Sequence, residues 1–180
     1  VVDSHLENGQ QPQEIYGNQL GMGITAENVA VEYEISREDQ DQFALESQRR
    51  AAKAIEEGMF HDEIVPIEVT AGKKTIVFDT DEHPRPDTTM EKLRQLKPAF
   101  RKDGTVTAGN TCGRNDGASA VLLMTEETAR QNNLTPMAAV VDWAACGVDP
   151  RVMGIGPVPA INKLLKRTNK TIEDIDLFEI

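Results

Sequence analysis

The sequence has few aromatic residues, few cysteines and no long apolar run. Aromatic side chains make up 4% of its 180 residues, and the two cysteines, Cys112 and Cys146, are too few for the disulfide framework of a small secreted domain. Their spacing matches no zinc motif, so we expect no metal site and reduced thiols in a cytoplasmic protein. The apolar stretches at 118–124 and 137–146 fall far short of the ~20 residues of a membrane-spanning helix.

Basic residues are also scarce relative to acidic ones. Lys and Arg total 19 against 30 Asp and Glu, which gives a formal net charge of -11. Nucleic-acid binding needs a basic face to neutralise phosphates, so this composition argues against it. A local basic pocket for a small phosphate ligand stays compatible with the net charge. Residues 1–5 show no basic patch before an apolar run and no initiator methionine, so we expect no signal peptide and leave the true start open.

Helical patterns fill much of the first half of the chain. The polar residues 1–20 predict loop, and Thr25 is then expected to cap a short helix through Ala30. Ser36 is a better cap, because acidic residues follow it in the first turn, where the helix dipole favours them. Apolar residues then recur at helical spacing until Gly58, where we expect the helix to stop.

Two short strands and a further helix are expected next. Residues 63–70 alternate apolar and polar side chains, and 75–78 is a second β-like run, so the pair reads as a hairpin. A proline-rich crossing follows. Thr88 or Thr89 is then predicted to cap a short helix through Leu96.

Strand-like and helix-like segments alternate in the second half. Apolar runs predict strands at 118–125, 137–146 and 177–180, and helices are expected at 126–133 and 157–168. This alternation is typical of an α/β protein with a parallel, helix-covered sheet.

A glycine-rich loop at 107–117 is the most distinctive local feature. Three glycines and two asparagines among its eleven residues indicate tight turns and close backbone approach. Such a loop before an apolar strand either binds a ligand or is a plain cluster of turns. Cys112 within it has no histidine in a suggestive pattern, so we interpret Cys112 as non-catalytic and Cys146 as a core residue.

Arg85 stands between Pro84 and Pro86. The two prolines hold the backbone extended and stiff, which suits a guanidinium that binds an anion. An ordinary surface arginine explains the same pattern. The residues alone therefore indicate a cytoplasmic α/β protein with a glycine-rich loop.

Several segments, in this order, resemble signatures of the thiolase family. They are Met-Gly-Ile-Thr-Ala-Glu-Asn at 22–28, Ser-Arg-Glu-Asp-Gln-Asp-Gln-Phe-Ala at 36–44, Lys-Pro-Ala-Phe at 97–100, Gly-Thr-Val-Thr-Ala-Gly-Asn at 104–110, Asn-Asp-Gly-Ala at 115–118 and Asp-Pro-Arg-Val-Met-Gly-Ile-Gly-Pro at 149–157. The resemblance covers nearly the whole chain. It implies a layered αβαβα fold, with 1–114 as most of a loop domain, 115–135 as a strand closing the first core domain and 136–180 as the start of the second.

The resemblance also implies an activity. Thiolases condense two acyl-CoA molecules, such as acetyl-CoA to acetoacetyl-CoA, or cleave a 3-ketoacyl-CoA with coenzyme A by a ping-pong mechanism through an acyl-cysteine. The family's catalytic cysteines and histidine match no residue of this chain, so we expect it to be inactive alone and to supply the ligand-holding part. Coenzyme A is a substrate, and no cofactor is held permanently. Homodimers or homotetramers are expected, with no nucleic-acid or membrane partner.

Site residues are carried over from the resemblance by position. Arg85 matches a contact to the adenine and phosphate end of coenzyme A. Cys112 stands where the family usually has a serine, and a thiol is a weaker donor than a hydroxyl. Gly21 replaces a histidine of many short-chain members, which leaves the acyl-chain preference open. The residues expected around the coenzyme A and acyl groups are Met22, Gln48, Arg85, Lys92, Leu93, Leu96, Phe100, Ala108, Cys112 and Met153.

Two alternatives to a thiolase enzyme share features with this sequence. A non-catalytic thiolase-like protein that binds acyl-CoA or lipid, such as a sterol carrier or a scaffold, would keep the fold without the chemistry. A condensing enzyme that uses acyl-carrier protein is disfavoured by the match around 108–117.

Overall fold

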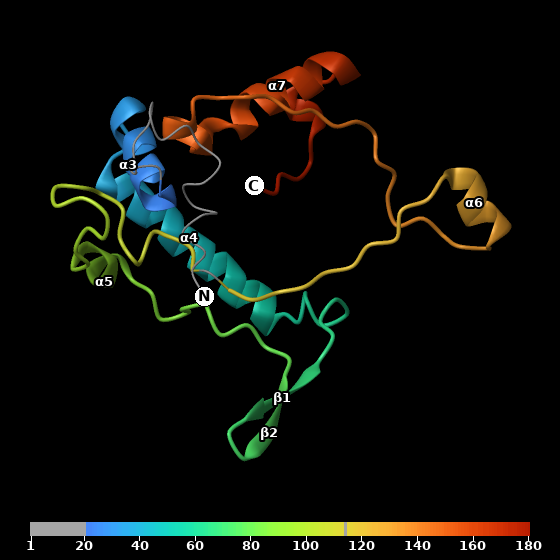
Figure 1. Ribbon diagram of the computed structural model, residues 1–180, viewed down its shortest axis with the longest axis horizontal. Coiled ribbons are helices and arrows are strands. Elements are labelled where there is room, and N and C mark those ends of the chain that lie inside the picture. The colour runs from blue at the N-terminus through green and yellow to red at the C-terminus, as the bar shows by residue number, and fades with distance from the viewer. Residues whose placement is uncertain (1–20, 114) are drawn as a thin grey trace. The chain divides into compact units, whose positions relative to one another are not determined.

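The computed structural model describes residues 21–113 and 115–180 (Figure 1). They form two compact units: one is Met22–Asn115, and the other contains Asp116–Ile180. The loop expected at 1–20 lies outside the described residues.

The first unit opens with helix α3, Met22–Glu32. Thr25 lies inside this helix, and its hydroxyl donates to the carbonyl of Met22 at 2.8 Å. The prediction that Thr25 is the N-cap was therefore wrong. Its hydroxyl bonds backward to a carbonyl of the preceding turn, whereas a capping oxygen accepts from an amide of the following turn.

Helix α4, Arg37–Glu56, begins and ends where the sequence predicts. Ser36 Oγ accepts from the amide of Asp39 at 3.1 Å, and the Asp39 carboxylate accepts from the amide of Ser36 at 3.3 Å. This reciprocal pair is a capping box that satisfies two backbone donors at the helix start. Gly58 follows the last turn with φ 68°, a left-handed conformation that glycine adopts without steric cost.

A two-stranded antiparallel hairpin follows, as expected. Strand β1 is Ile67–Ala71 and strand β2 is Lys74–Phe78, with Val69 opposite Ile76. The first strand starts at Ile67 and not at residue 63, because Pro66 has no amide hydrogen to donate to a ladder. Gly72 makes the turn at φ 65°.

Helix α5, Met90–Arg94, packs against α4. Thr89 is its N-cap and accepts from the amide of Lys92 at 3.3 Å. The core of this unit is small and partly polar. Its buried residues are Thr25, Glu27, Ala30, Asp41, Leu45, Leu93, Val106 and Thr107.

The second unit contains the short helix α6, Glu126–Gln131, and the helix α7, Pro157–Thr168. Between them lies the 3-10 helix η1, Pro150–Ile155, and after α7 comes the 3-10 helix η2, Ile172–Asp174. Helix α7 has the bounds that the sequence predicts. Asn169 closes it with φ 53°.

The strands predicted in this second unit do not form. Residues 118–125, 137–146 and 177–180 have no ladder partner among the residues that the structure describes, and Figure 1 draws the chain on either side of α6 as extended coil. Their apolar side chains are exposed: Val121 by 84%, Leu122 by 78% and Val141 by 76%. A strand is defined by hydrogen bonds to its neighbours, so an apolar extended segment without a neighbour stays coil.

Within residues 21–113 and 115–180, no helix has both the length and the apolar character needed to cross a membrane.

Candidate functional site

Two predicted site residues that are distant in sequence meet directly. The backbone amide of Arg85 donates to Oε1 of Gln48 on α4 at 2.7 Å. The guanidinium of Arg85 turns back over its own segment, where Nη1 donates to the carbonyls of Glu82 at 2.8 Å and His83 at 3.1 Å. An anion bound by Arg85 would therefore meet a cation whose backbone is anchored to α4.

Lys92 supplies a second cation beside this segment. Its Nζ donates to the carbonyl of Asp87 at 2.7 Å and also pairs with the Asp87 carboxylate. The hydrogen bond and charge of Lys92 hold the pKa of Asp87 below its usual range, with a smaller contribution from Arg85. Both partners are largely exposed, so this pair adds little to stability.

The start of the glycine-rich loop is fixed by a buried carboxylate of α3. Glu27 is 2% exposed, and its Oε1 and Oε2 atoms accept from the amides of Thr105 at 3.1 and 3.0 Å and of Val106 at 3.0 Å. Backbone amides at this distance satisfy a buried carboxylate well. These bonds fix the backbone orientation of the two residues that precede the loop.

The middle of the loop closes on itself through Asn110. Its Oδ1 accepts from the amide of Thr107 at 2.7 Å, and its Nδ2 donates to the carbonyl of Thr105 at 3.1 Å. Thr107 is fully buried, whereas Ala108 and Cys112 are exposed. The loop is thus a fixed support that presents these two exposed residues to solvent.

Glycines bring the loop against the other predicted residues. A Cβ at Gly109 would lie 2.5 Å from Leu93 Cδ2 and Leu96 Cδ1, so only glycine lets the loop rest on α5 and the turn that follows it. Leu93 is 3% exposed and packs beneath Gly109 as part of the core, whereas Leu96 is 37% exposed.

Glycines also make close contacts at the end of the loop and near Phe100. A Cβ at Gly113 would lie only 2.8 Å from Cε1 of His83, so the end of the loop lies against the segment that carries Arg85. Gly23 packs directly on the ring of Phe100. Met22, next to it, and Phe100 are both exposed.

Nine of the ten predicted site residues thus lie in the unit Met22–Asn115. Seven of them lie on or near α5, the segment of Arg85 and the glycine-rich loop, and the other two, Met22 and Phe100, lie beside Gly23. Met153, the tenth, lies on η1 in the other unit and is 45% exposed.

The family comparison decides what this chain is related to. A family model described as "Thiolase, N-terminal domain" matches residues 5–127, and one described as "Thiolase, C-terminal domain" matches residues 134–180. The chain belongs to the thiolase family. Thiolase relatives include the "Probable acetyl-CoA acyltransferase" of Staphylococcus epidermidis, 54% identical over 91% of this chain and 42% of that protein. The "3-ketoacyl-CoA thiolase, mitochondrial" of Bos taurus is 50% identical over 90% of this chain and 41% of its own length.

Solved thiolase structures agree with the fold prediction. The acetyl-CoA acetyltransferase of Bacillus anthracis superposes with a TM-score of 0.84 at 55% identity, covering 87% of this chain and 40% of that one. The human mitochondrial 3-ketoacyl-CoA thiolase gives a TM-score of 0.86 at 47% identity, over 96% of this chain and 42% of that one. The α/β thiolase fold is confirmed. The chain spans about two fifths of the length of these relatives.

Sequence reasoning missed the polar residues that hold this thiolase loop, namely Glu27, Arg37, Asp41 and Asn110. Arg37 and Asp41 stand four positions apart on a predicted helix, which signals a pair on one face. Nothing in that spacing indicates that Asp41 is buried or that its other partner lies 69 positions away.

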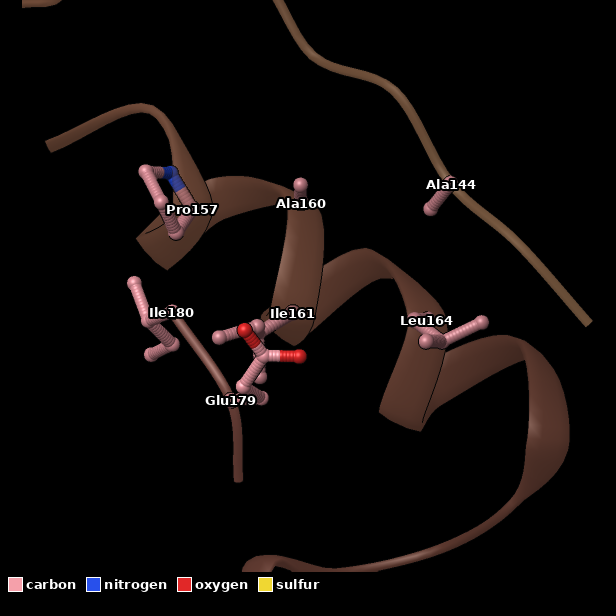
Figure 2. A pocket seen from close by; sticks show the side chains of 7 residues that line it. All are labelled: Ala144, Pro157, Ala160, Ile161, Leu164, Glu179 and Ile180. Carbon is pink, nitrogen blue, oxygen red and sulfur yellow. The ribbon is translucent and has the colours of Figure 1, made fainter. Parts of the chain in front are cut away.

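An apolar pocket of about 430 Å³ lies in the other unit of this thiolase chain, beside α7. Figure 2 shows Ile161 of α7 next to Glu179 and Ile180 of the C-terminal segment. No predicted site residue lines it. Its lining residues are Ala144, Pro157, Ala160, Ile161, Leu164, Glu179 and Ile180. They are the apolar face of an amphipathic helix and the extended segments beside it.

Proposed function

We propose that this chain supplies the coenzyme A-binding part of a thiolase-type acyltransferase. The proposed reaction condenses two acyl-CoA molecules, as in acetyl-CoA to acetoacetyl-CoA, or cleaves a 3-ketoacyl-CoA with coenzyme A. The observation that carries the proposal is the convergence of Arg85, its anchor Gln48 and the glycine-rich loop around α5. The names of the relatives, acetyl-CoA acyltransferase and 3-ketoacyl-CoA thiolase, supply the substrate class.

The chemistry of the ligand suits the chemistry of this region. Coenzyme A carries phosphates at its nucleotide end and an amide-rich pantetheine arm that leads to the thiol. Arg85 and Lys92 provide charge for the phosphates. The exposed loop at Ala108 and Cys112 offers a backbone carbonyl and a weak thiol donor to the arm. Met22 and Phe100 supply apolar surface at the acyl end.

The proposed mechanism is ping-pong, with an acyl-cysteine formed and then consumed. No step is assigned to Cys112 or Cys146. Both are exposed thiols, so the interpretation of Cys146 as a core residue was wrong. This chain's share of the chemistry is to bind and orient the thioester substrate, which lowers the entropic cost of bringing the reactants together. A cytoplasmic homodimer or homotetramer is the proposed form of the whole protein.

The domain division is part of the same proposal. Residues 1–114 are assigned to the loop domain, 115–135 to a segment that closes the first core domain as a strand once its neighbours in the whole protein are present, and 136–180 to the start of the second core domain. The division of the structure into units at Asn115 and Asp116 supports the first of these boundaries.

The test is a steady-state assay of the whole protein with acetoacetyl-CoA and coenzyme A. We expect thiolysis that saturates with coenzyme A, together with double-reciprocal plots that stay parallel when both substrates are varied, as a ping-pong mechanism requires. Coenzyme A binding without turnover would favour the non-catalytic acyl-CoA-binding alternative. The absence of both binding and turnover would refute the proposal.

A further inference from the structure

A partly buried ion pair on α4 also bonds to the end of α5. Arg37 Nε donates to Asp41 Oδ2 at 2.8 Å, and the Asp41 side chain is 1% exposed. The Nη2 atom of Arg37 also donates to the carbonyls of Leu93 at 2.6 Å and Leu96 at 3.1 Å. One guanidinium therefore ties the helix α4 to the turn in which α5 ends, where Leu93 and Leu96 project toward Gly109.

The other oxygen of Asp41 holds the glycine-rich loop. Asn110 Nδ2 donates to Asp41 Oδ1 at 2.9 Å and to the carbonyl of Thr105 at 3.1 Å. Both carboxylate oxygens of Asp41 are thus engaged, one by the guanidinium that holds α5 and one by the amide that holds the loop. This buried carboxylate therefore links the position of α5 to that of the loop.

From this connection we infer that Arg37 and Asp41 are positioning residues for coenzyme A, an inference that rests on the proposed function. Asp41 has no exposed surface, so it acts on a ligand only through the residues that it holds. The groups that it holds belong to the end of α5, which carries Leu96, and to the glycine-rich loop, which carries Ala108 and Cys112. Removing one partner of a buried charge pair leaves the other uncompensated, so the two sides lose their fixed spacing.

The experiment uses the whole protein and compares three variants. Asp41→Asn keeps the shape and one acceptor but removes the charge. Arg37→Lys keeps the charge but replaces a planar fork that reaches three acceptors by a single ammonium. Glu46→Gln is the matched control, because Glu46 forms an i,i+4 pair with Arg50 on the same helix at the same 2.8 Å, but its side chain is 46% exposed against 1% for Asp41.

We expect the KM for coenzyme A to rise about tenfold in Asp41→Asn and about threefold in Arg37→Lys, with kcat changed less than about twofold, because uniform binding is lost while the transition-state contacts remain. Glu46→Gln should keep the wild-type KM, since an exposed pair contributes little. A melting temperature recorded for each variant separates this effect from a loss of folded protein.

Each outcome decides the inference. Variants that melt earlier but keep the wild-type KM show a purely structural role and overturn it. If Asp41→Asn does not fold, the KM of Arg37→Lys decides alone. A wild-type protein that turns over acyl-CoA while both variants keep its KM refutes this inference only. A wild-type protein that neither binds nor uses coenzyme A refutes the proposed function and the inference together.

Discussion

The backbone amide of Arg85 donates to the side-chain oxygen of Gln48 at 2.7 Å, across 37 positions of sequence. Arg85 also lies between two prolines, which restrict its backbone. The backbone of Arg85 is therefore held against α4, although the side chain is exposed. A charged side chain on a backbone that is already fixed loses less conformational entropy on binding an anion than one on a flexible loop.

Replacing Arg85 by alanine tests the proposal that it binds the nucleotide end of coenzyme A. In the whole protein, Arg85→Ala should raise the KM for coenzyme A, with kcat changing less, because a remote contact contributes mostly uniform binding. Steady-state kinetics with varied coenzyme A measure both constants. Arg130→Ala is the control, since Arg130 pairs with Glu126 on α6 in the other unit. A loss of kcat at constant KM would contradict this assignment.

Gly109 tests the close approach of the loop to α5. A Cβ there would lie 2.5 Å from a methyl carbon of each of two leucines, Leu93 and Leu96. Gly109→Ala should destabilise the whole protein by about 1–3 kcal/mol, as overpacking does, and should raise the KM for coenzyme A. Gly21→Ala is the stability control, because none of the residues that the structure describes lies within 4 Å of a Cβ at Gly21, its chain neighbours apart. Equal melting temperatures for the two variants would show that the loop yields without cost.

The capping box of α4 gives a prediction on stability alone. Ser36→Ala removes the oxygen that accepts from the amide of Asp39 at 3.1 Å and should cost about 1 kcal/mol. The comparison is Ser47→Ala, the same change at an exposed position inside the same helix, where alanine has the higher helix propensity. Urea unfolding of both variants measures the difference. A Ser36→Ala variant as stable as Ser47→Ala would mean that the cap contributes nothing.

The exposed apolar segments predict self-association of the 180-residue chain expressed alone. Val121, Leu122 and Val141 are each at least 76% exposed. Apolar segments whose backbone groups have no ladder partner can pair with other chains. Sedimentation velocity should show oligomers or aggregates. Val141→Lys should reduce association, whereas Gln131→Lys, the same added charge on the exposed helix α6, should not. A monodisperse monomer with a cooperative melt would contradict the prediction.

Local signals in the sequence predicted the local structure well. Ser36 with Asp39, Gly58, the hairpin turn at Gly72 and the bounds of α7 each depend on residues within a few positions of one another. Thr25 failed as a cap because the same side chain bonds backward as readily as forward. The residue type alone does not specify which of these two hydrogen bonds a threonine forms.

Long-range partners were not predictable from one sequence. The bonds of Glu27 to Val106 and of Asp41 to Asn110 span 79 and 69 positions, and no local pattern encodes such a pairing. The apolar runs at 118–125 and 137–146 predicted strands that do not form in this chain. Whether such a run becomes a strand depends on its neighbours, which lie outside its own residues.

A crystal structure of the whole protein with coenzyme A bound tests the proposed binding region most directly. We predict that the phosphates lie within hydrogen-bonding distance of Arg85 or Lys92. The pantetheine arm should pass along Ala108 and Cys112, over Gly109 and Leu96. Coenzyme A bound elsewhere, for example in the apolar pocket against Ile161 and Leu164 of α7, would contradict it.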